Sequence, residues 1–151
     1  MAIKTSTGLA AKMLVTSSAK TLLDGGFIKV YGSAEPATAD TALAGSPLLL
    51  WTISVNGDGT GLTWDPTAVG RSMVKPTAAT WCGATVAGTA VFFRVVGSAD
   101  DGLLSTTQPR IQGTCGTTAD SDMYMSSTTI ATNVSITAKS LSAFSITLPT
   151  N

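Results

Sequence analysis

The sequence predicts an all-β protein: an antiparallel β-sandwich or barrel of about eight or nine short strands, with a short N-terminal helix or arm. Three observations lead to this fold class. Short runs of β-branched and aromatic residues recur along the chain. Turn residues (Gly, Pro, Asp and Asn) separate these runs roughly every ten residues. Ser and Thr are abundant, and they suit the solvent-facing positions of strands without adding charge.

Residues 1–26 form the predicted N-terminal helix or arm, and residues 27–151 form the predicted single β-domain. Ser6 or Thr7 is suited to cap a helix. Four apolar residues then follow at helical spacing: Leu9, Ala10, Met13 and Leu14. The run Asp24-Gly25-Gly26 ends this segment, because glycine favours turns and helix termini.

The β-domain is expected to consist of segments whose side chains alternate between two faces. They cover residues 27–31, 48–55, 62–64, 71–75, 81–86, 90–96, 111–115, 122–126 and 134–148. A hairpin is predicted at 56–59, where glycine tolerates the positive φ that tight turns need. The segment 97–109 is expected to be a long loop with its tightest bend at 100–102, and one helical turn is expected near 39–43.

The charge content is low. Only 12% of the residues are charged, about half the usual share, and nine basic residues balance nine acidic ones. No basic patch is present in the sequence, which argues against nucleic-acid binding. No run approaches the roughly 20 apolar residues of a membrane span, and the N-terminus lacks the apolar core of a signal peptide. We therefore expect a protein made in the cytoplasm that covers its weakly charged surface by assembling.

The side chains that enzymes use are scarce. Histidine is absent, which excludes Ser-His-Asp and Cys-His catalysis. Glu35 is the sole glutamate, and the aspartates mostly stand in turn-like contexts. We therefore expect no enzyme, no cofactor and no metal site. Cys82 and Cys115 are expected to be small buried side chains, and their spacing leaves a disulfide between them open.

Two further patterns resemble binding sites. Residues 56–61 place oxygen-bearing side chains at alternate positions as calcium loops do, but Thr67 stands where such a loop has its carboxylate. A glycine-rich hairpin turn is the preferred interpretation of this segment. Trp51 is expected in the core, whereas Trp64 and Trp81 are open to a role in sugar binding.

The first half of the chain contains, in order, the segments MAIKTSTGLAAKML, LLDGGFIKVYGSAEPATAD and NGDGTGLTW. The second half continues with TAVFFRVVGSADDGLLSTTQPRIQGTCG, DMYMSST and the terminal SITLP. In this succession, which covers more than half of the chain, the sequence resembles a family of small virion proteins of tailed bacteriophages. The resemblance implies a structural protein of the phage virion that is made in the host cytoplasm.

The first functional expectation is a capsid decoration (cement) protein that binds and stabilises the assembled head. A neck/collar or tail-associated virion subunit is an alternative, and a carbohydrate- or receptor-binding β-module is an alternative from a different class. The expected partners are the major capsid protein or neck proteins, and further copies of the chain in a homo-oligomer. Neither nucleic acid nor a membrane is expected as a partner.

Assembly contacts are expected in two segments that have few evident internal partners, the N-terminal arm and the loop 97–109. The residues expected to make them are Ile3, Lys4, Leu9, Met13, Asp100, Asp101, Leu103, Leu104 and Arg110.

Overall fold

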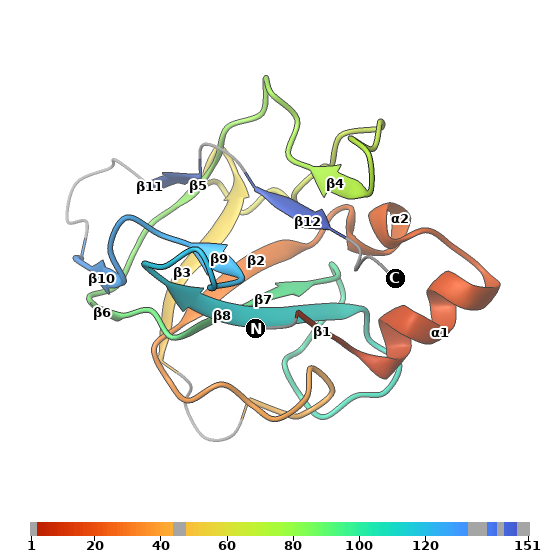
Figure 1. Ribbon diagram of the computed structural model, residues 1–151, viewed down its shortest axis with the longest axis horizontal. Coiled ribbons are helices and arrows are strands. Elements are labelled where there is room, and N and C mark those ends of the chain that lie inside the picture. The colour runs from red at the N-terminus through yellow and green to blue at the C-terminus, as the bar shows by residue number, and fades with distance from the viewer. Residues whose placement is uncertain (1–2, 44–47, 133–138, 142–143, 148–151) are drawn as a thin grey trace.

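The computed structural model describes residues 3–43, 48–132, 139–141 and 144–147. Strands dominate the chain, and two short helices, α1 (Thr7–Val15) and α2 (Ala19–Leu23), lie near its N-terminus (Figure 1). The strands are β1 (Lys4–Thr5), β2 (Phe27–Tyr31), β3 (Leu49–Val55), β4 (Ser72–Val74), β5 (Trp81–Gly83), β6 (Gly88–Thr89), β7 (Phe92–Val96), β8 (Arg110–Gly116), β9 (Met123–Tyr124), β10 (Thr129–Ile130), β11 (Lys139–Leu141) and β12 (Ser145–Thr147). The all-β prediction is confirmed, and its finer form, a sandwich or barrel, stays a prediction.

Eight strands form the main sheet, in the order β1-β8-β7-β2-β3-β5-β11, with β9 beside β8. Neighbouring strands are antiparallel except β8 and β9, which run parallel. Two small sheets, β4–β12 and β6–β10, have two strands each. The central strands β7, β2 and β3 are consecutive neighbours, so the most apolar segments of the sequence lie in the middle of the sheet.

The hydrophobic core lies on one face of the main sheet. Alternation along paired strands brings four apolar side chains of β2 and β7 together on this face: Ile28, Val30, Phe93 and Val95. Trp64 and Trp81 pack edge to face in the same core, with ring centroids 5.0 Å apart. Phe144, next to β12, contacts both Trp64 and Phe93, so the β4–β12 sheet covers this face of the main sheet (Figure 1).

The opposite face carries polar side chains. The register places Lys29, Arg94, Gln112 and Lys4 next to one another across β2, β7, β8 and β1. Arg94 and Gln112 are fully buried although they point away from the hydrophobic core. The loop 32–43 covers them: Arg94 donates a hydrogen bond to the Thr41 carbonyl, and Gln112 donates one to the Pro36 carbonyl. The sheet thus has an apolar interior on one face. On the other face the buried polar side chains lie beside the stacked rings of Tyr31 and Phe92.

The N-terminal segment, predicted as a helix or arm, joins the main sheet through β1. β1 pairs with β8, and two helices follow where the sequence predicted one short helix. Ser6 caps α1 and Ser18 caps α2, each through a side-chain oxygen that accepts a backbone N–H three residues later. The polar pair Ser17-Ser18 separates the two helices, because hydroxyl side chains favour caps over helix interiors.

The connections differ from the sequence prediction in three places. Residue Leu62 forms only an isolated bridge with Gly26, where a strand was expected at 62–64. The segment near 39–43 is a turn in which the Thr41 N–H donates to the Thr38 carbonyl, not a helical turn. The segment predicted as one strand at 134–148 contains the two short strands β11 and β12, and its other residues lie mostly outside the described ranges.

The predicted hairpin turn after β3 is present. Asn56 and Gly57 have positive φ angles of 54° and 71°, the left-handed region that Gly and Asn tolerate best. Val55 and Thr60 close the turn as a bridged pair.

Candidate functional site

The two segments expected to make assembly contacts lie against each other. Ser6 is fully buried and joins them: its hydroxyl donates to the Gln108 carbonyl (2.8 Å) and accepts the Arg110 N–H (2.9 Å). Gly8 rests on the same loop so closely that a β-carbon there would lie 2.4 Å from the Thr107 carbonyl carbon. Residues 3–15 and 97–109 therefore form one continuous surface, which we call the loop–helix surface.

The buried side chain of Arg110 holds the loop of this surface in place. Its guanidinium pairs with Asp100, and both side chains are buried, with 0% and 1% of their areas exposed. It also donates to the carbonyl oxygens of Leu103 (2.8 Å) and Ala39 (3.3 Å). One buried cation thus connects strand β8 to both covering loops, and the charge-assisted hydrogen bonds fix the loop backbone.

A second buried guanidinium, that of Arg94, stabilises the neighbouring loop. It donates to the Gln112 side-chain oxygen (3.1 Å) and to the Thr41 carbonyl (3.2 Å). Gln112 in turn donates to the Pro36 carbonyl (2.8 Å). Burial, followed by the positive charge of Arg110, lowers the pKa of Arg94 from its usual value. The oxygens that accept hydrogen bonds from Arg94 belong to neutral groups and replace the water that a buried cation loses. The buried carboxylate of Asp100 is paired with Arg110 instead.

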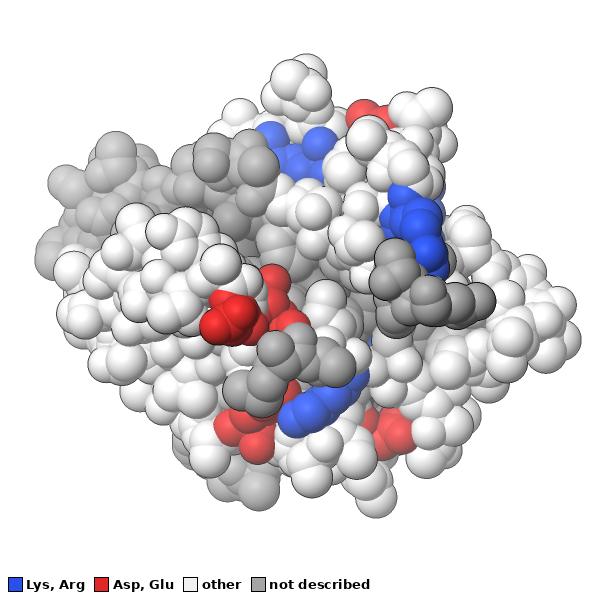
Figure 2. Space-filling view, viewed as in Figure 1, with Lys and Arg blue, Asp and Glu red and all other residues white. Residues whose placement is uncertain are grey.

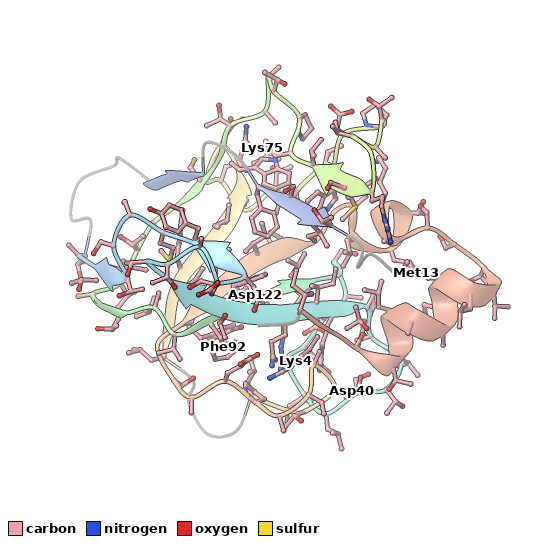
Figure 3. All side chains as sticks on the ribbon, viewed as in Figure 1. Lys4, Met13, Asp40, Lys75, Phe92 and Asp122 are labelled. Atoms are coloured by element: carbon pink, nitrogen blue, oxygen red, sulfur yellow. The ribbon has the colours of Figure 1, made fainter. Side chains whose placement is uncertain are left out.

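The loop 97–109 is further ordered by local hydrogen bonds. The Gly102 N–H donates to the Asp100 carboxylate (2.8 Å), and the Leu103 N–H donates to Asp101 (3.0 Å). The Ser105 N–H donates to the backbone carbonyl of Asp40 (3.0 Å). Figure 3 shows Asp40 and Lys4 on the same side of the sheet, below β8. The loop is therefore fixed at its bend and at its middle.

This ordered loop presents apolar side chains to solvent. Leu103 is 64% exposed and Leu104 is 73% exposed, and at the C-terminal end of α1 Leu14 is 86% exposed. Hydrogen bonds fix the backbone of this loop, yet the side chains of Leu103 and Leu104 do not pack within the chain. They are the features of the surface that suit contact with another protein.

The nine residues predicted as contacts separate into two groups. Five of them are structural: Ile3 packs against the core, Lys4 pairs with Glu35 (2.9 Å), and Leu9, Asp100 and Arg110 are buried. The prediction that they are free for assembly contacts is wrong for the three buried ones, because their side chains have partners inside the chain. The other four are exposed on the loop–helix surface: Met13, Asp101, Leu103 and Leu104.

Sequence reasoning missed the polar residues that hold the loops. Asp40 accepts both the N–H and the hydroxyl of Thr7, at 2.9 Å and 2.6 Å. Gln112 bridges Arg94 to the loop backbone. The signal that was available is the presence of Arg94 within an apolar strand, since a charged residue between buried neighbours requires internal partners.

The tryptophans do not form a sugar-binding surface. Trp51 is 4% exposed, and Trp64 and Trp81 are fully buried, so the suggestion that Trp64 and Trp81 are open to ligands is wrong. They serve the core, where the rings of Trp64 and Trp81 contact each other and Trp64 also contacts Phe144.

Other candidate sites also have structural explanations. Residues 56–61 form a turn in which the Asp58 carboxylate accepts the Thr60 N–H (2.8 Å), and hydrogen bonds from Thr60 lower the pKa of Asp58. Cys82 and Cys115 are free thiols, and burial raises the pKa of Cys115 to about 12. Within the described ranges, no three His, Cys, Asp or Glu side chains gather as metal ligands, and no helix there is long and apolar enough to span a membrane.

Comparison of the chain with protein-family models, with curated proteins and with solved structures finds no match. The loop–helix surface is therefore interpreted from its own geometry.

Proposed function

We propose that the chain is a non-enzymatic structural protein of a tailed-phage virion, and that it binds and stabilises the assembled head as a capsid decoration (cement) protein. The observation that carries the proposal is the pair of exposed leucines, Leu103 and Leu104, on a loop that buried hydrogen bonds hold in place. The succession of segments that resembles small phage virion proteins supports the choice of partner.

The energetics of the loop favour binding. Burying a leucine fully contributes roughly 1.5–3 kcal/mol, and both leucines stand on the same loop. Ordering a mobile loop on binding would offset part of this gain. The contacts of Arg110 and Asp100 fix the loop in the free protein, so less conformational entropy is lost when a partner covers the leucines.

Such binding stabilises a capsid by mass action. A protein that binds the assembled shell, but not the separate capsid subunits, shifts the equilibrium towards the shell by an amount that grows with its free concentration. No catalytic group is needed for this role. A neck/collar or tail-associated position uses the same kind of contact and differs only in the partner. The sugar-binding alternative loses its basis because the tryptophans are buried.

The test uses heads from the phage that encodes the chain, prepared with this gene deleted. The purified protein is added, binding is measured by co-sedimentation, and head rupture on heating is followed by a dye that reports released DNA. We expect the wild type to sediment with the heads and to raise the rupture temperature. The double variant Leu103→Asp/Leu104→Asp should lose both effects.

Val69→Asp is the matched control, because Val69 is an exposed apolar residue (66%) outside the loop–helix surface. It should bind heads as the wild type does. The head assignment fails if the wild type does not bind heads, or if the double leucine variant binds them normally. Antibody labelling of complete virions at the neck or tail would then identify the alternative position.

A further inference from the structure

The turn that follows β3 contains a reactive pair of residues that the proposed function does not use. Asn56 is followed by Gly57, and both residues are exposed. An asparagine side chain can react with the backbone nitrogen of the next residue, and glycine hinders this approach least because it has no side chain. The sequence has three asparagines, and Asn56 is the one that precedes a glycine.

The peptide unit between Asn56 and Gly57 is free to rotate. Within the described residues, the Gly57 N–H donates to no acceptor, and neither the carbonyl nor the side-chain amide of Asn56 makes a hydrogen bond. The hydrogen bonds that shape the turn use other groups. The Val55 N–H donates to the Thr60 carbonyl (2.9 Å), and the Asp58 N–H donates to the Val55 carbonyl (3.3 Å). Rotation that brings the Gly57 nitrogen to the Asn56 side chain therefore breaks no hydrogen bond of that unit.

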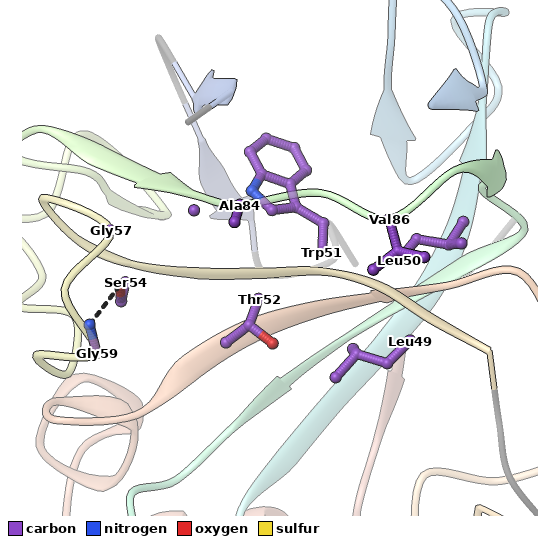
Figure 4. A pocket seen from close by; sticks show the side chains of 10 residues that line it. Leu49, Leu50, Trp51, Thr52, Ser54, Gly57, Gly59, Ala84 and Val86 are labelled. Atoms are coloured by element: carbon purple, nitrogen blue, oxygen red, sulfur yellow. Dashed lines mark hydrogen bonds between the residues drawn. The ribbon is translucent and has the colours of Figure 1, made fainter. Parts of the chain in front are cut away.

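Three aspartates also precede a glycine, at positions 24, 58 and 101, but their glycines are not free in this way. The glycine N–H groups of these pairs all donate hydrogen bonds: Gly25 to the Leu62 carbonyl (2.8 Å), Gly59 to the Ser54 hydroxyl (3.1 Å) and Gly102 to the Asp100 carboxylate (2.8 Å). Figure 4 shows the bond of Gly59 as a dashed line, with Gly57 on the same turn and outside this bond.

We infer that Asn56 is a site of spontaneous deamidation, with the backbone nitrogen of Gly57 as the nucleophile. Hydroxide from water takes the proton of the Gly57 N–H, and the nitrogen attacks the side-chain carbonyl carbon of Asn56. The bond from that carbon to the side-chain nitrogen breaks, and ammonia leaves with a proton from water. The product is a succinimide ring. Water then adds to either ring carbonyl and opens the ring, which leaves aspartate or isoaspartate at position 56.

The neighbouring pair of Asp58 and Gly59 is protected from the same reaction. The Asp58 carboxylate accepts the Thr60 N–H (2.8 Å), and hydrogen bonds from Thr60 lower the pKa of Asp58. The group therefore stays ionised, and an ionised carboxylate is a poor target for a nucleophile. The Gly59 N–H is held by Ser54 as well. One turn thus carries a reactive pair beside a protected pair.

Deamidation changes the charge of a weakly charged chain. Nine basic residues balance nine acidic ones, and most of the described surface in Figure 2 carries no charged side chain. One new carboxylate beside Asp58 gives the chain a net negative charge, and isoaspartate lengthens the turn backbone by a methylene group. Strands β2 and β7 separate β3 from β8, which underlies the loop–helix surface. The reaction is therefore independent of the proposed head binding.

The test ages the purified protein in mildly alkaline buffer made with heavy-oxygen water. Peptide mass spectrometry locates the oxygen that ring opening adds, and an isoaspartate-specific methyltransferase labels the isoaspartate product. We expect Asn56 to take up solvent oxygen severalfold faster than Asn133, which precedes the β-branched Val134. Asn56→Gln should abolish the conversion at position 56, because the longer side chain does not close the same ring.

Asp58→Asn is the matched variant, because it separates the effect of the turn from that of the sequence motif. It places a second asparagine–glycine pair in the same turn, but the Gly59 N–H of this pair still donates to Ser54. In the folded variant, position 58 should convert about fivefold more slowly than Asn56, the ratio that a net hydrogen bond of about 1 kcal/mol implies. In concentrated urea the two positions should convert at equal rates.

Two results would overturn the inference. One is a folded protein that leaves Asn56 unchanged while the urea-unfolded chain converts, since the turn would then protect this residue. The other is equal conversion of positions 56 and 58 in the folded Asp58→Asn variant, because the free peptide unit at Gly57 would then make no difference.

Discussion

The buried pair of Arg110 and Asp100 gives the sharpest test of how the loop–helix surface is held. Arg110→Met removes the cation but keeps most of the side-chain volume, and it leaves the Asp100 carboxylate buried without its partner. The same change removes the donors to the carbonyl oxygens of Leu103 and Ala39. Among the described residues, Asp100 forms its salt bridge with Arg110 alone.

The expected cost follows from burial. Removing one partner of a fully buried ion pair costs roughly 3–5 kcal/mol, because the remaining charge loses its compensation. For a domain of this size, 1 kcal/mol corresponds to about 2–4 °C in the thermal midpoint, so Arg110→Met should lower it by roughly 10 °C. Asp100→Asn should cost less, about 1–3 kcal/mol, because Arg110 keeps its carbonyl acceptors. The double variant Arg110→Met/Asp100→Asn should be destabilised by about 2 kcal/mol less than the sum of the two single costs.

The assay is urea unfolding followed by tryptophan fluorescence, which reports on Trp64 and Trp81 as they leave the core. Lys4→Met is the control, because the Lys4–Glu35 pair is partly exposed and should contribute at most about 1 kcal/mol. The reasoning is refuted if Arg110→Met costs no more than Lys4→Met. It is also refuted if the double variant loses the full sum of the two single losses in unfolding free energy, because Arg110 and Asp100 would then not interact.

Three further measurements test other contacts. Ser6→Ala should cost about 2 kcal/mol in urea unfolding, more than Ser18→Ala, because the Ser6 hydroxyl is buried and bonds two segments whereas the exposed Ser18 caps only its own helix. Gly8→Ala should destabilise by roughly 1–3 kcal/mol despite the better helix propensity of alanine, because the β-carbon meets the backbone of Thr107. Burial raises the pKa of Tyr31 from 10.0 to about 12, so its contribution to stability should be lost as pH rises from 10 to 12, and Tyr31→Phe should show a smaller loss across that range.

The parts of the fold that the sequence predicted are those governed by local patterns. Alternation of side chains identified β2, β3 and β7, because each has one face in the apolar core. The turn after β3 was predictable because Asn56 and Gly57 suit positive φ. Ser6 was predictable as a helix cap from its position before an apolar, helix-forming run.

The polar interior was not predictable in the same way. Alternation shows that Phe92 and Arg94 share a strand face, but it does not show whether solvent or a loop covers that face. The covering of that face depends on where the loops 32–43 and 97–109 fold back. Hydrogen bonds between residues far apart in the sequence determine those positions. The suggestion that Trp64 and Trp81 are open to ligands was wrong for the same reason. Their burial depends on non-local packing, in which Trp81 lies against Trp64 and Trp64 lies against Phe144.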